Sequence, residues 1–437
     1  MAVTGMAVAR WHPRRIPRSG RVLLFLGLLV PLMVRAVIRA SREVVSGDFH
    51  VFWLAGKAFR TGAPLYFVPH GAIAFNYPPF AAMLFIPFSF LPVRVAAALF
   101  NCLNVVLIAV SIWLTYAIFE TLYPERNRAL WPLVLAVVLS GHFALYNINL
   151  IQMNEVMFVL CLLGVKGYLD RKDLLAASAF VVGTLLKIIP GFFLAWLVIR
   201  GRSRAAMMAL TILLLCLLLP ILARGPGTGL QDLSDYRSHF LAAYVHGRVM
   251  PDGPSNQNLG SLIYRMVLPS ENQENIDYQI FALTERSAAV IYRVSFFVAL
   301  ASFLAHLVAL RIKGKPLSVF EIGSVFLIGH LLSGITWKAH LVTLLFVFYA
   351  FLSTRIESLP RGLKVLVVGV NIMSLVIGLS GRDLVGWAAN YYAAGYSLYA
   401  WTLVFLYLGC LIFSQRSAPI QRAQGSDAKN LVPSTVT

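Results

Sequence analysis

The chain has 437 residues, of which 59% are hydrophobic and 13% are charged, and its mean hydropathy is +0.76. The charged residues are too few to cover the surface of a soluble globule of this length, so the composition excludes a soluble protein. The formal net charge of +19 does not indicate a nucleic-acid partner, since the basic residues stand at the ends of apolar runs. The composition instead predicts an all-α polytopic membrane protein.

Apolar runs near the length that crosses ~30 Å of hydrocarbon recur along the whole chain. They predict about twelve transmembrane helices. We place these helices at residues 21–38, 95–119, 129–147, 152–168, 174–187, 189–200, 205–223, 287–311, 318–334, 340–354, 363–380 and 396–413. The motif Lys187-Ile188-Ile189-Pro190 separates the fifth segment from the sixth. We interpret that pair as two short helices that meet at one face of the membrane.

The basic residues collect on one side of this arrangement, which predicts that both termini are cytoplasmic. The extracytoplasmic side then receives the two longest loops, at about 39–94 and 224–286, in which we expect short interfacial helices. The chain thus divides into a basic leader (1–20), a single transmembrane domain (21–413) and a polar cytoplasmic tail (414–437) that we expect to be disordered. The first apolar segment is expected to remain as an anchor rather than to be cleaved as a signal peptide. The four cysteines stand singly in apolar runs, so they are expected to pack and not to bind metal.

Polar residues interrupt the apolar sequence at several distant points, and on this topology they all fall on the extracytoplasmic face. The first is Asp48, which follows the first apolar segment in the motif Gly47-Asp48-Phe49-His50. An ionisable residue at the edge of a bilayer is a candidate functional residue. The others are His50, Tyr77, Gln152, Asn154, Lys187, Asn256, Asn258, Arg265, Lys338 and His340. Their common side predicts a single site that borders the lipid.

The chemistry of these residues fits group transfer from a lipid-linked phosphate donor to a hydroxyl acceptor. A carboxylate can accept a proton from a hydroxyl, so Asp48 is assigned as the general base. Cations bind phosphate through strong charge-assisted hydrogen bonds, so the donor phosphate is assigned to Lys187, Arg265 and Lys338. We expect no second carboxylate at the distance from Asp48 that a covalent route would need, which favours a single-displacement, inverting reaction. No Asp-x-Asp pair occurs in the outer loops near Asp48, so we expect no metal ion or other cofactor. The acidic pair Asp232 and Asp235 is interpreted as a feature of loop solvation.

Several motifs occur in an order and spacing that resemble one known family. They are Gly47-Asp48-Phe49-His50, Tyr77-Pro78-Pro79-Phe80, Gln152-Met153-Asn154, Lys187-Ile188-Ile189-Pro190, Asn256-Gln257-Asn258, Arg265 and Trp337-Lys338-Ala339-His340. Together they resemble glycosyltransferase family 87 over most of the chain. The resemblance implies a GT-C membrane fold, a polyprenyl-phosphate sugar donor, which is polyprenyl-phosphate mannose in several members, and a glycolipid or cell-envelope glycan acceptor.

The resemblance also implies roles for particular residues and a location for the enzyme. His340 is expected to assist Asp48, and the active site is expected on the extracytoplasmic (periplasmic) side of the bacterial cytoplasmic membrane. The remaining polar residues of the predicted site are expected to bind substrate; they are His50, Tyr77, Gln152, Asn154, Asn256 and Asn258.

The residues alone leave other interpretations open. Asp48 also fits the N-cap of an amphipathic helix that begins at Phe49, and Gln152 and Asn154 also fit hydrogen bonds between helices. Broken helices with polar interruptions occur in transporters, so a transporter or flippase of lipid-linked sugars is the first alternative function. An O-antigen-type polymerase or ligase is the second. The one-sided polar cluster favours the transferase, because transporters bind their substrates near the bilayer midplane.

Overall fold

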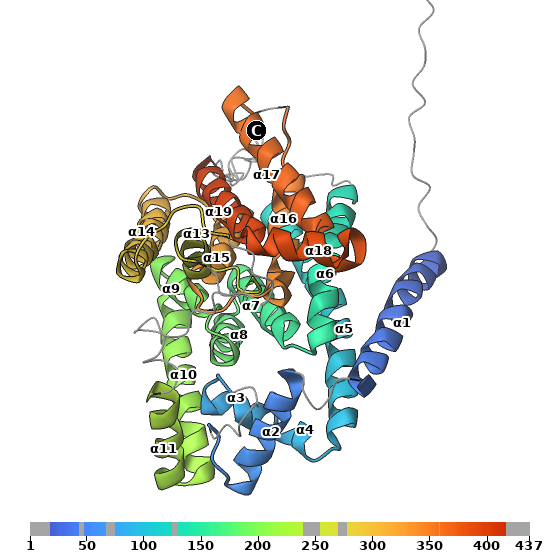
Figure 1. The fold of residues 1–437 in the computed structure, drawn as a ribbon, viewed down its shortest axis with the longest axis vertical. Helices are drawn as coiled ribbons and strands as arrows, with labels where there is room; N and C mark the ends of the chain where they lie inside the picture. The colour runs from blue at the N-terminus through green and yellow to red at the C-terminus, as the bar shows by residue number, and fades with distance from the viewer. Residues whose placement is uncertain are drawn as a thin grey trace, which may run out of the picture.

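The computed structural model is a bundle of helices joined by turns and short loops (Figure 1). It describes residues 18–42, 48–66, 75–124, 130–238, 254–269, 278–357 and 359–416. No β-strand occurs within these ranges. Most of the predicted leader and of the predicted tail lies outside the described residues.

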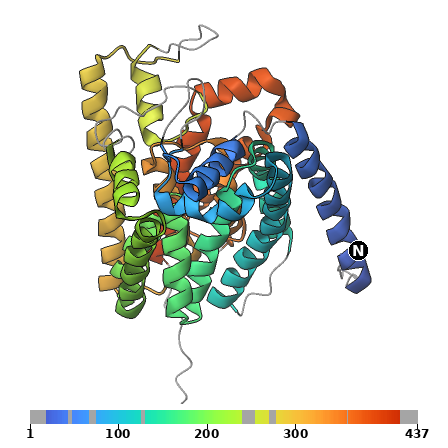
Figure 2. The ribbon, with the colours of Figure 1, turned by 90° about the horizontal axis from the view of Figure 1, so that it is seen from below.

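Six of the helices are long and apolar enough to cross a membrane, and each coincides with a predicted span. They are α5 (Val93–Leu122), α6 (Trp131–Leu150), α10 (Ser203–Arg224), α14 (Glu285–Ile312), α17 (Arg361–Leu379) and α19 (Leu398–Arg416). The expectation of an all-α polytopic membrane protein is therefore confirmed. Figure 2 shows the bundle from below, with α14 (yellow) and α1 (blue; Arg18–Arg42) at opposite edges.

The other predicted spans also coincide with helices, most of which are shorter. They are α1, α7 (Asn154–Leu169), α8 (Asp173–Leu186), α9 (Gly191–Ile199), α15 (Val319–Leu332) and the pair η2 (Lys338–Thr343) and α16 (Leu344–Leu352). The predicted break between the fifth and sixth segments is confirmed, because α8 ends before Lys187 and α9 begins after Pro190. Lys187 itself has an extended backbone with φ −157°. The total of twelve spans stays a prediction.

Short helices occupy the two predicted long loops. They are α2 (Asp48–Thr61), α3 (Pro79–Leu84) and α4 (Ile86–Ser89) in the first loop, and α11 (Pro226–Tyr236) and α13 (Leu259–Val267) in the second. A further exposed helix, α18 (Arg382–Gly395), joins α17 to α19. In Figure 1, α2, α3 and α4 lie together between the α10–α11 pair on one side and α5 on the other.

Helix α2 forms because its apolar residues return every three or four positions. Phe49, Phe52 and Phe59 lie on one face of the helix and are buried. The ring of Phe52 stacks on that of Phe85 with centroids 4.9 Å apart, and Phe49 packs on Phe100 at 5.2 Å. Burial of each such side chain stabilises the fold by roughly 1.5–3 kcal/mol. This aromatic layer holds the helix that begins with Asp48.

The structure corrects the interpretation of Asp232 as a solvated loop residue. Asp232 is 3% exposed, and its Oδ2 lies 2.6 Å from Nε of Arg224 in an ion pair between α11 and the end of α10. A carboxylate is buried at this level only when a charge or hydrogen bonds compensate the lost hydration. Asp235, by contrast, accepts a hydrogen bond from Gln231 at an exposed position.

A second buried ion pair ties α9 to α15. Arg200, at the end of α9, pairs with Glu321 in the first turn of α15, and Trp196 Nε1 donates to the same carboxylate at 2.7 Å. Arg200 also donates to the backbone carbonyl of Lys315 at 2.8 Å. Since Glu321 is 1% exposed, the pair is sheltered from solvent and joins two otherwise apolar helices.

We expect Glu321→Ala to destabilise the protein by about 3–5 kcal/mol, because it leaves the Arg200 charge buried without its partner. The matched control is Asp170→Ala, which removes the partly exposed pair with Lys166 and should cost at most about 1 kcal/mol. Thermal unfolding of the two variants in the same detergent measures the difference. Equal midpoints would contradict the structural role of the Arg200–Glu321 pair.

Candidate functional site

The turn between α6 and α7 is the centre of the candidate site. Ile151 lies in the left-handed region with φ 53° and ψ 46°, which is rare for a β-branched residue. The backbone N–H of Gln152 closes the turn on the carbonyl of Asn147 at 3.1 Å. Such a conformation costs on the order of 1–3 kcal/mol and persists only where the surroundings fix it. The turn therefore holds Gln152 and Asn154 in fixed positions.

Gln152 connects this turn to the predicted base. Its side-chain Nε2 donates a hydrogen bond to Oδ2 of Asp48, the first residue of α2. Its backbone carbonyl accepts a hydrogen bond from Nδ2 of Asn104 on α5, at 2.9 Å. Asp48 is thus held by a residue 104 positions away, a contact that the alternative helix-cap interpretation does not account for.

Asn154 brings the predicted cation to the same place. Lys187, in the break between α8 and α9, donates a hydrogen bond to Oδ1 of Asn154. Nδ2 of the same Asn154 side chain donates a hydrogen bond to Oδ1 of Asn147 at 2.9 Å. Lys187 interacts electrostatically with Asp48 and with His340. The structure therefore brings together five residues that the sequence assigned to one site: Asp48, Gln152, Asn154, Lys187 and His340.

The surroundings of Asp48 tune its acidity. Burial raises the pKa of this carboxyl above its ordinary value, because burial disfavours the charged form. The hydrogen bond from Gln152 and the positive charge of Lys187 act in the opposite direction. A carboxylate whose pKa is raised accepts a proton more readily than an ordinary one, which is the property that a general base needs.

His340 lies at the start of the segment that leads into α16, and its ring is held by backbone. Its Nδ1 accepts a hydrogen bond from the N–H of Trp337 at 3.2 Å, and the ring also bonds to the backbone of Ile335. The indole of Trp337 stacks on it with 14° between the planes. These contacts fix the ring beside Lys187 in a position that can support the site.

Asn256 and Asn258, just before α13, bond to the backbone that precedes Lys338 and His340. The amide of Asn256 bonds to the backbone of Gly334 (3.1 Å) and Thr336 (2.8 Å). Nδ2 of Asn258 donates to the carbonyls of Ser333 and Gly334 at 2.6 and 2.7 Å.

Arg265 is 2% exposed, and it donates to Ser397 Oγ (2.8 Å) and to the carbonyl of Asn256 (2.7 Å). Its guanidinium therefore joins the segment around Asn256 to the turn between α18 and α19.

The remaining predicted residues contact residues outside this cluster. Lys338 donates to Oδ1 of Asn390 on α18 at 2.6 Å, and its ammonium lies 4.9 Å from the ring centroid of Tyr399. The ring of His50 stacks on Trp53, one turn further along α2. The ring of Tyr77 packs on Phe52 at 5.1 Å, which fits a structural role at the entry to α3.

Sequence reasoning missed three residues of the site. Asn147 bonds to both Gln152 and Asn154, Asn390 anchors Lys338, and Glu155 is 2% exposed beside Ser111. The signal for Asn147 was present, because amides at 147, 149, 152 and 154 stand out in apolar sequence. Nothing in the sequence links Asn390 to Lys338, since 52 residues separate them.

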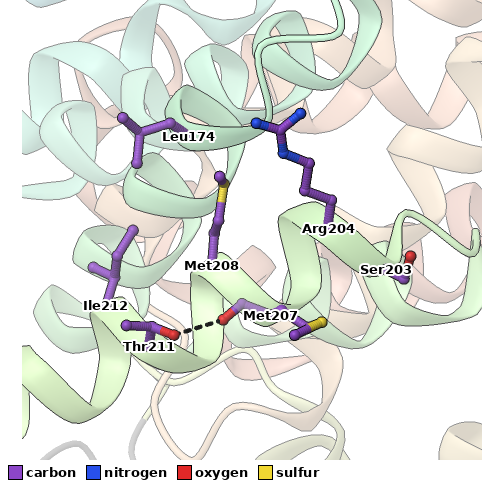
Figure 3. Close-up of a pocket in the computed structure, with 7 residues that line it drawn as sticks. All are labelled: Leu174, Ser203, Arg204, Met207, Met208, Thr211 and Ile212. Atoms are coloured by element: carbon purple, nitrogen blue, oxygen red, sulfur yellow. Dashed lines mark hydrogen bonds between the residues drawn. The ribbon is translucent and has the colours of Figure 1, made fainter.

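A cavity of about 550 Å³ lies between α8 and α10, away from this cluster (Figure 3). It is lined by Leu174, Ser203, Arg204, Met207, Met208, Thr211 and Ile212. Leu174 is at the start of α8, whereas Lys187 follows its end, so roughly 20 Å of helix separates the cavity from the site. In the described ranges, no group of three or more His, Cys, Asp or Glu residues is placed to hold a metal ion.

Comparison with known proteins identifies the family. The model of glycosyltransferase family 87 matches residues 75–334, which is more than half of the chain. The chain belongs to glycosyltransferase family 87. The protein is therefore a membrane glycosyltransferase, as its motifs and its apolar helices together indicated. The matched region includes Gln152, Asn154 and Lys187, whereas Asp48 and His340 lie outside it.

A curated relative gives a more detailed comparison. The chain is 27% identical over 318 residues to a polyprenol-phosphate-mannose-dependent alpha-(1-2)-phosphatidylinositol mannoside mannosyltransferase of Mycobacterium tuberculosis. The match covers 67% of this chain and 65% of the relative, so the chain spans just under two thirds of the relative's length.

We expect Gln152→Met and Lys187→Met each to raise the pKa of Asp48 further, because each removes a neighbour that stabilises the carboxylate. Carbodiimides react with the protonated carboxyl, so labelling of Asp48 should extend to higher pH in both variants. Mass spectrometry of the labelled peptide across a pH series measures this, with Lys166→Met as a control at a distant partly exposed lysine. Unchanged labelling in both variants would contradict the contacts described for Asp48.

Proposed function

We propose that this membrane glycosyltransferase transfers mannose from a polyprenyl-phosphate donor to a hydroxyl group of a glycolipid or cell-envelope glycan, with inversion. The observation that supports this most directly is the carboxylate of Asp48, bonded to Gln152 and facing the charge of Lys187. A displacement reaction needs a base for its attacking hydroxyl and a cation for its leaving phosphate, and this pair provides both. The base activates the acceptor, and the cation stabilises the departing phosphate.

In this mechanism Asp48 removes the proton from the acceptor hydroxyl. The acceptor oxygen forms a bond to the anomeric carbon of the sugar while the bond from that carbon to the phosphate oxygen breaks. Polyprenyl phosphate leaves with an additional negative charge, which the ammonium groups of Lys187 and Lys338 neutralise. The single base and single displacement account for the proposed inversion.

Three residues that the sequence assigned to substrate are proposed instead to support the structure around the site. They are Arg265, Asn256 and Asn258. Arg265 is 2% exposed and its guanidinium already bonds to Ser397 and Asn256, so a phosphate could reach it only by displacing buried neighbours. Leaving buried partners unsatisfied costs about 1–3 kcal/mol for each group. The side-chain amides of Asn256 and Asn258 are likewise buried and already bond to the backbone that precedes Lys338 and His340.

The proposed donor and acceptor classes draw on the relative's printed name. That protein is described as using polyprenol-phosphate-mannose and as acting on a phosphatidylinositol mannoside. Lys187, held in a break between apolar helices, suits the phosphate of such a lipid donor. The basic residues collected at the opposite ends of the predicted spans favour an active site on the extracytoplasmic face of the bacterial cytoplasmic membrane.

We expect Asp48→Asn to lower turnover by ~10²–10⁴-fold, the usual contribution of a positioned general base, while leaving the melting temperature nearly unchanged. Asn retains the size of the side chain, and its amide oxygen can still accept the hydrogen bond from Gln152. The matched control is Asp383→Asn, which changes an exposed carboxylate on α18.

The assay supplies purified protein with radiolabelled polyprenyl-phosphate mannose and a glycolipid extract. Labelled glycolipid together with released polyprenyl phosphate supports the transferase. Movement of labelled donor across a vesicle without release of polyprenyl phosphate would instead indicate the flippase. Full turnover in Asp48→Asn would remove Asp48 from the mechanism.

A further inference from the structure

The far end of helix α2 is held by an arginine that no part of the proposed mechanism uses. Arg224, the last residue of α10, donates hydrogen bonds from Nη1 to the carbonyls of Ala58 and Phe59 at 3.0 and 3.1 Å. Its Nη2 donates to the carbonyl of Ala63 at 2.7 Å. The last carbonyls of a helix have no partner within the helix, so one guanidinium here caps the C-terminus of α2.

Asp232 fixes that guanidinium in place. Its carboxylate lies 2.6 Å from Nε of Arg224, and the two side chains are 4% and 2% exposed, respectively. The guanidinium carbon also lies 5.3 Å from the ring centroid of Phe59, on the buried face of α2. A buried arginine with a carboxylate, three carbonyls and a ring around it has a single orientation.

Two glycines bring Asp232 to Arg224. Gly225 has φ 82°, a conformation that other residues rarely adopt, and it allows α11 to begin immediately after α10. Gly229 lies so close to α10 that an added Cβ would be 2.4 Å from Cα of Ile221. The α10–α11 pair is therefore packed backbone against backbone, and Asp232 follows Gly229 by three residues.

Helix α2 is thus held at both ends by different parts of the bundle. Its first residue, Asp48, bonds to Gln152 on the α6–α7 turn, and its last turn bonds to Arg224 on α10. Its 14 residues make a rigid rod of about 21 Å. Figure 1 shows α2 between α10 and α5, so it bridges two groups of helices. A displacement at one end of such a rod changes the position of the other end.

We propose that Arg224 and Asp232 are positioning residues for the base: by clamping the C-terminus of α2 they set the hydrogen bond between Asp48 and Gln152. This inference rests on the proposed function for its effect on catalysis, but the geometry that it claims can be tested without activity. Reactions are sensitive to such placement, since a shift of about 1 Å can cost on the order of 10²-fold in rate.

The experiment compares Arg224→Ala, Arg224→Lys and Asp232→Asn with Glu321→Ala. The last variant breaks the other buried ion pair, at α9 and α15, and serves as a matched control for a general loss of stability. The first readout is carbodiimide labelling of Asp48 across a pH series, which requires no substrate. The second is the pH dependence of kcat with labelled polyprenyl-phosphate mannose, together with KM for the donor.

The proposal predicts that Asp48 labelling extends to higher pH in Arg224→Ala and Asp232→Asn, because the carboxylate loses its bond to Gln152. The acid limb of kcat should shift in the same direction, and kcat should fall by about 10–100-fold with little change in donor KM. Arg224→Lys should retain only part of the wild-type kcat and labelling profile, since one amine cannot reach three carbonyls and a carboxylate. Glu321→Ala should lower the melting temperature and leave both pH profiles unchanged.

A folded Arg224→Ala or Asp232→Asn variant with the wild-type labelling profile would overturn the proposal. Should Arg224→Ala fail to fold, Asp232→Asn gives the same readout, because it keeps the size and polarity of the side chain. A shifted labelling profile in these variants, together with a wild-type protein that transfers no sugar, would support the clamp while refuting the proposed function. A shift in Glu321→Ala as well would show a general loss of stability and would also overturn the proposal.

Discussion

The hydrogen bonds of the α6–α7 turn are the constraint on which the candidate site depends. Through Asn149 the turn binds Arg39 of α1 at 2.9 Å, and through Gln152 it binds Asp48 of α2. Asn154 binds Lys187 in the break between α8 and α9. A single turn of eight residues thus connects three elements that are far apart in sequence. Without it, the predicted base and the predicted cation would have no common support.

The physical reason for this arrangement is the cost of burying polar groups in an apolar bundle. An unsatisfied amide in such a place costs about 1–3 kcal/mol, which favours hydrogen bonds from these side chains to other helices. Asn101 shows the principle on α5, where its Nδ2 donates to the carbonyls of Ala36 and Ile148 at 3.1 Å each. Because the partners lie on different helices, each amide that is satisfied also fixes one helix against another. The strained backbone of Ile151 is stabilised by the same bonds.

The sequence predicted the features that depend on local chemistry. The broken helix at 187–190 followed from a lysine and a proline in an apolar run, and the structure has it. The residues Asp48, Gln152, Asn154 and Lys187 followed from polar side chains at the ends of apolar segments, and the structure places them together.

Other features depend on tertiary contacts, which the sequence does not specify. An asparagine beside a functional segment can bond to a ligand or to backbone, and only the fold shows that Asn256 and Asn258 bond to backbone. The partner of Lys338 on α18 and the burial of Asp232 against Arg224 were likewise invisible, because no periodicity or motif connects those positions.

The central claim is that Asp48 and Lys187 face one reacting group, and a structure of the protein bound to polyprenyl phosphate tests it most directly. The account predicts that the phosphate lies within hydrogen-bond distance of Lys187 Nζ, on the side that faces Asp48, with the lipid tail leading away along the apolar helices. A phosphate bound elsewhere, with Lys187 still bonded to Asn154 and no space between it and Asp48, would contradict the account.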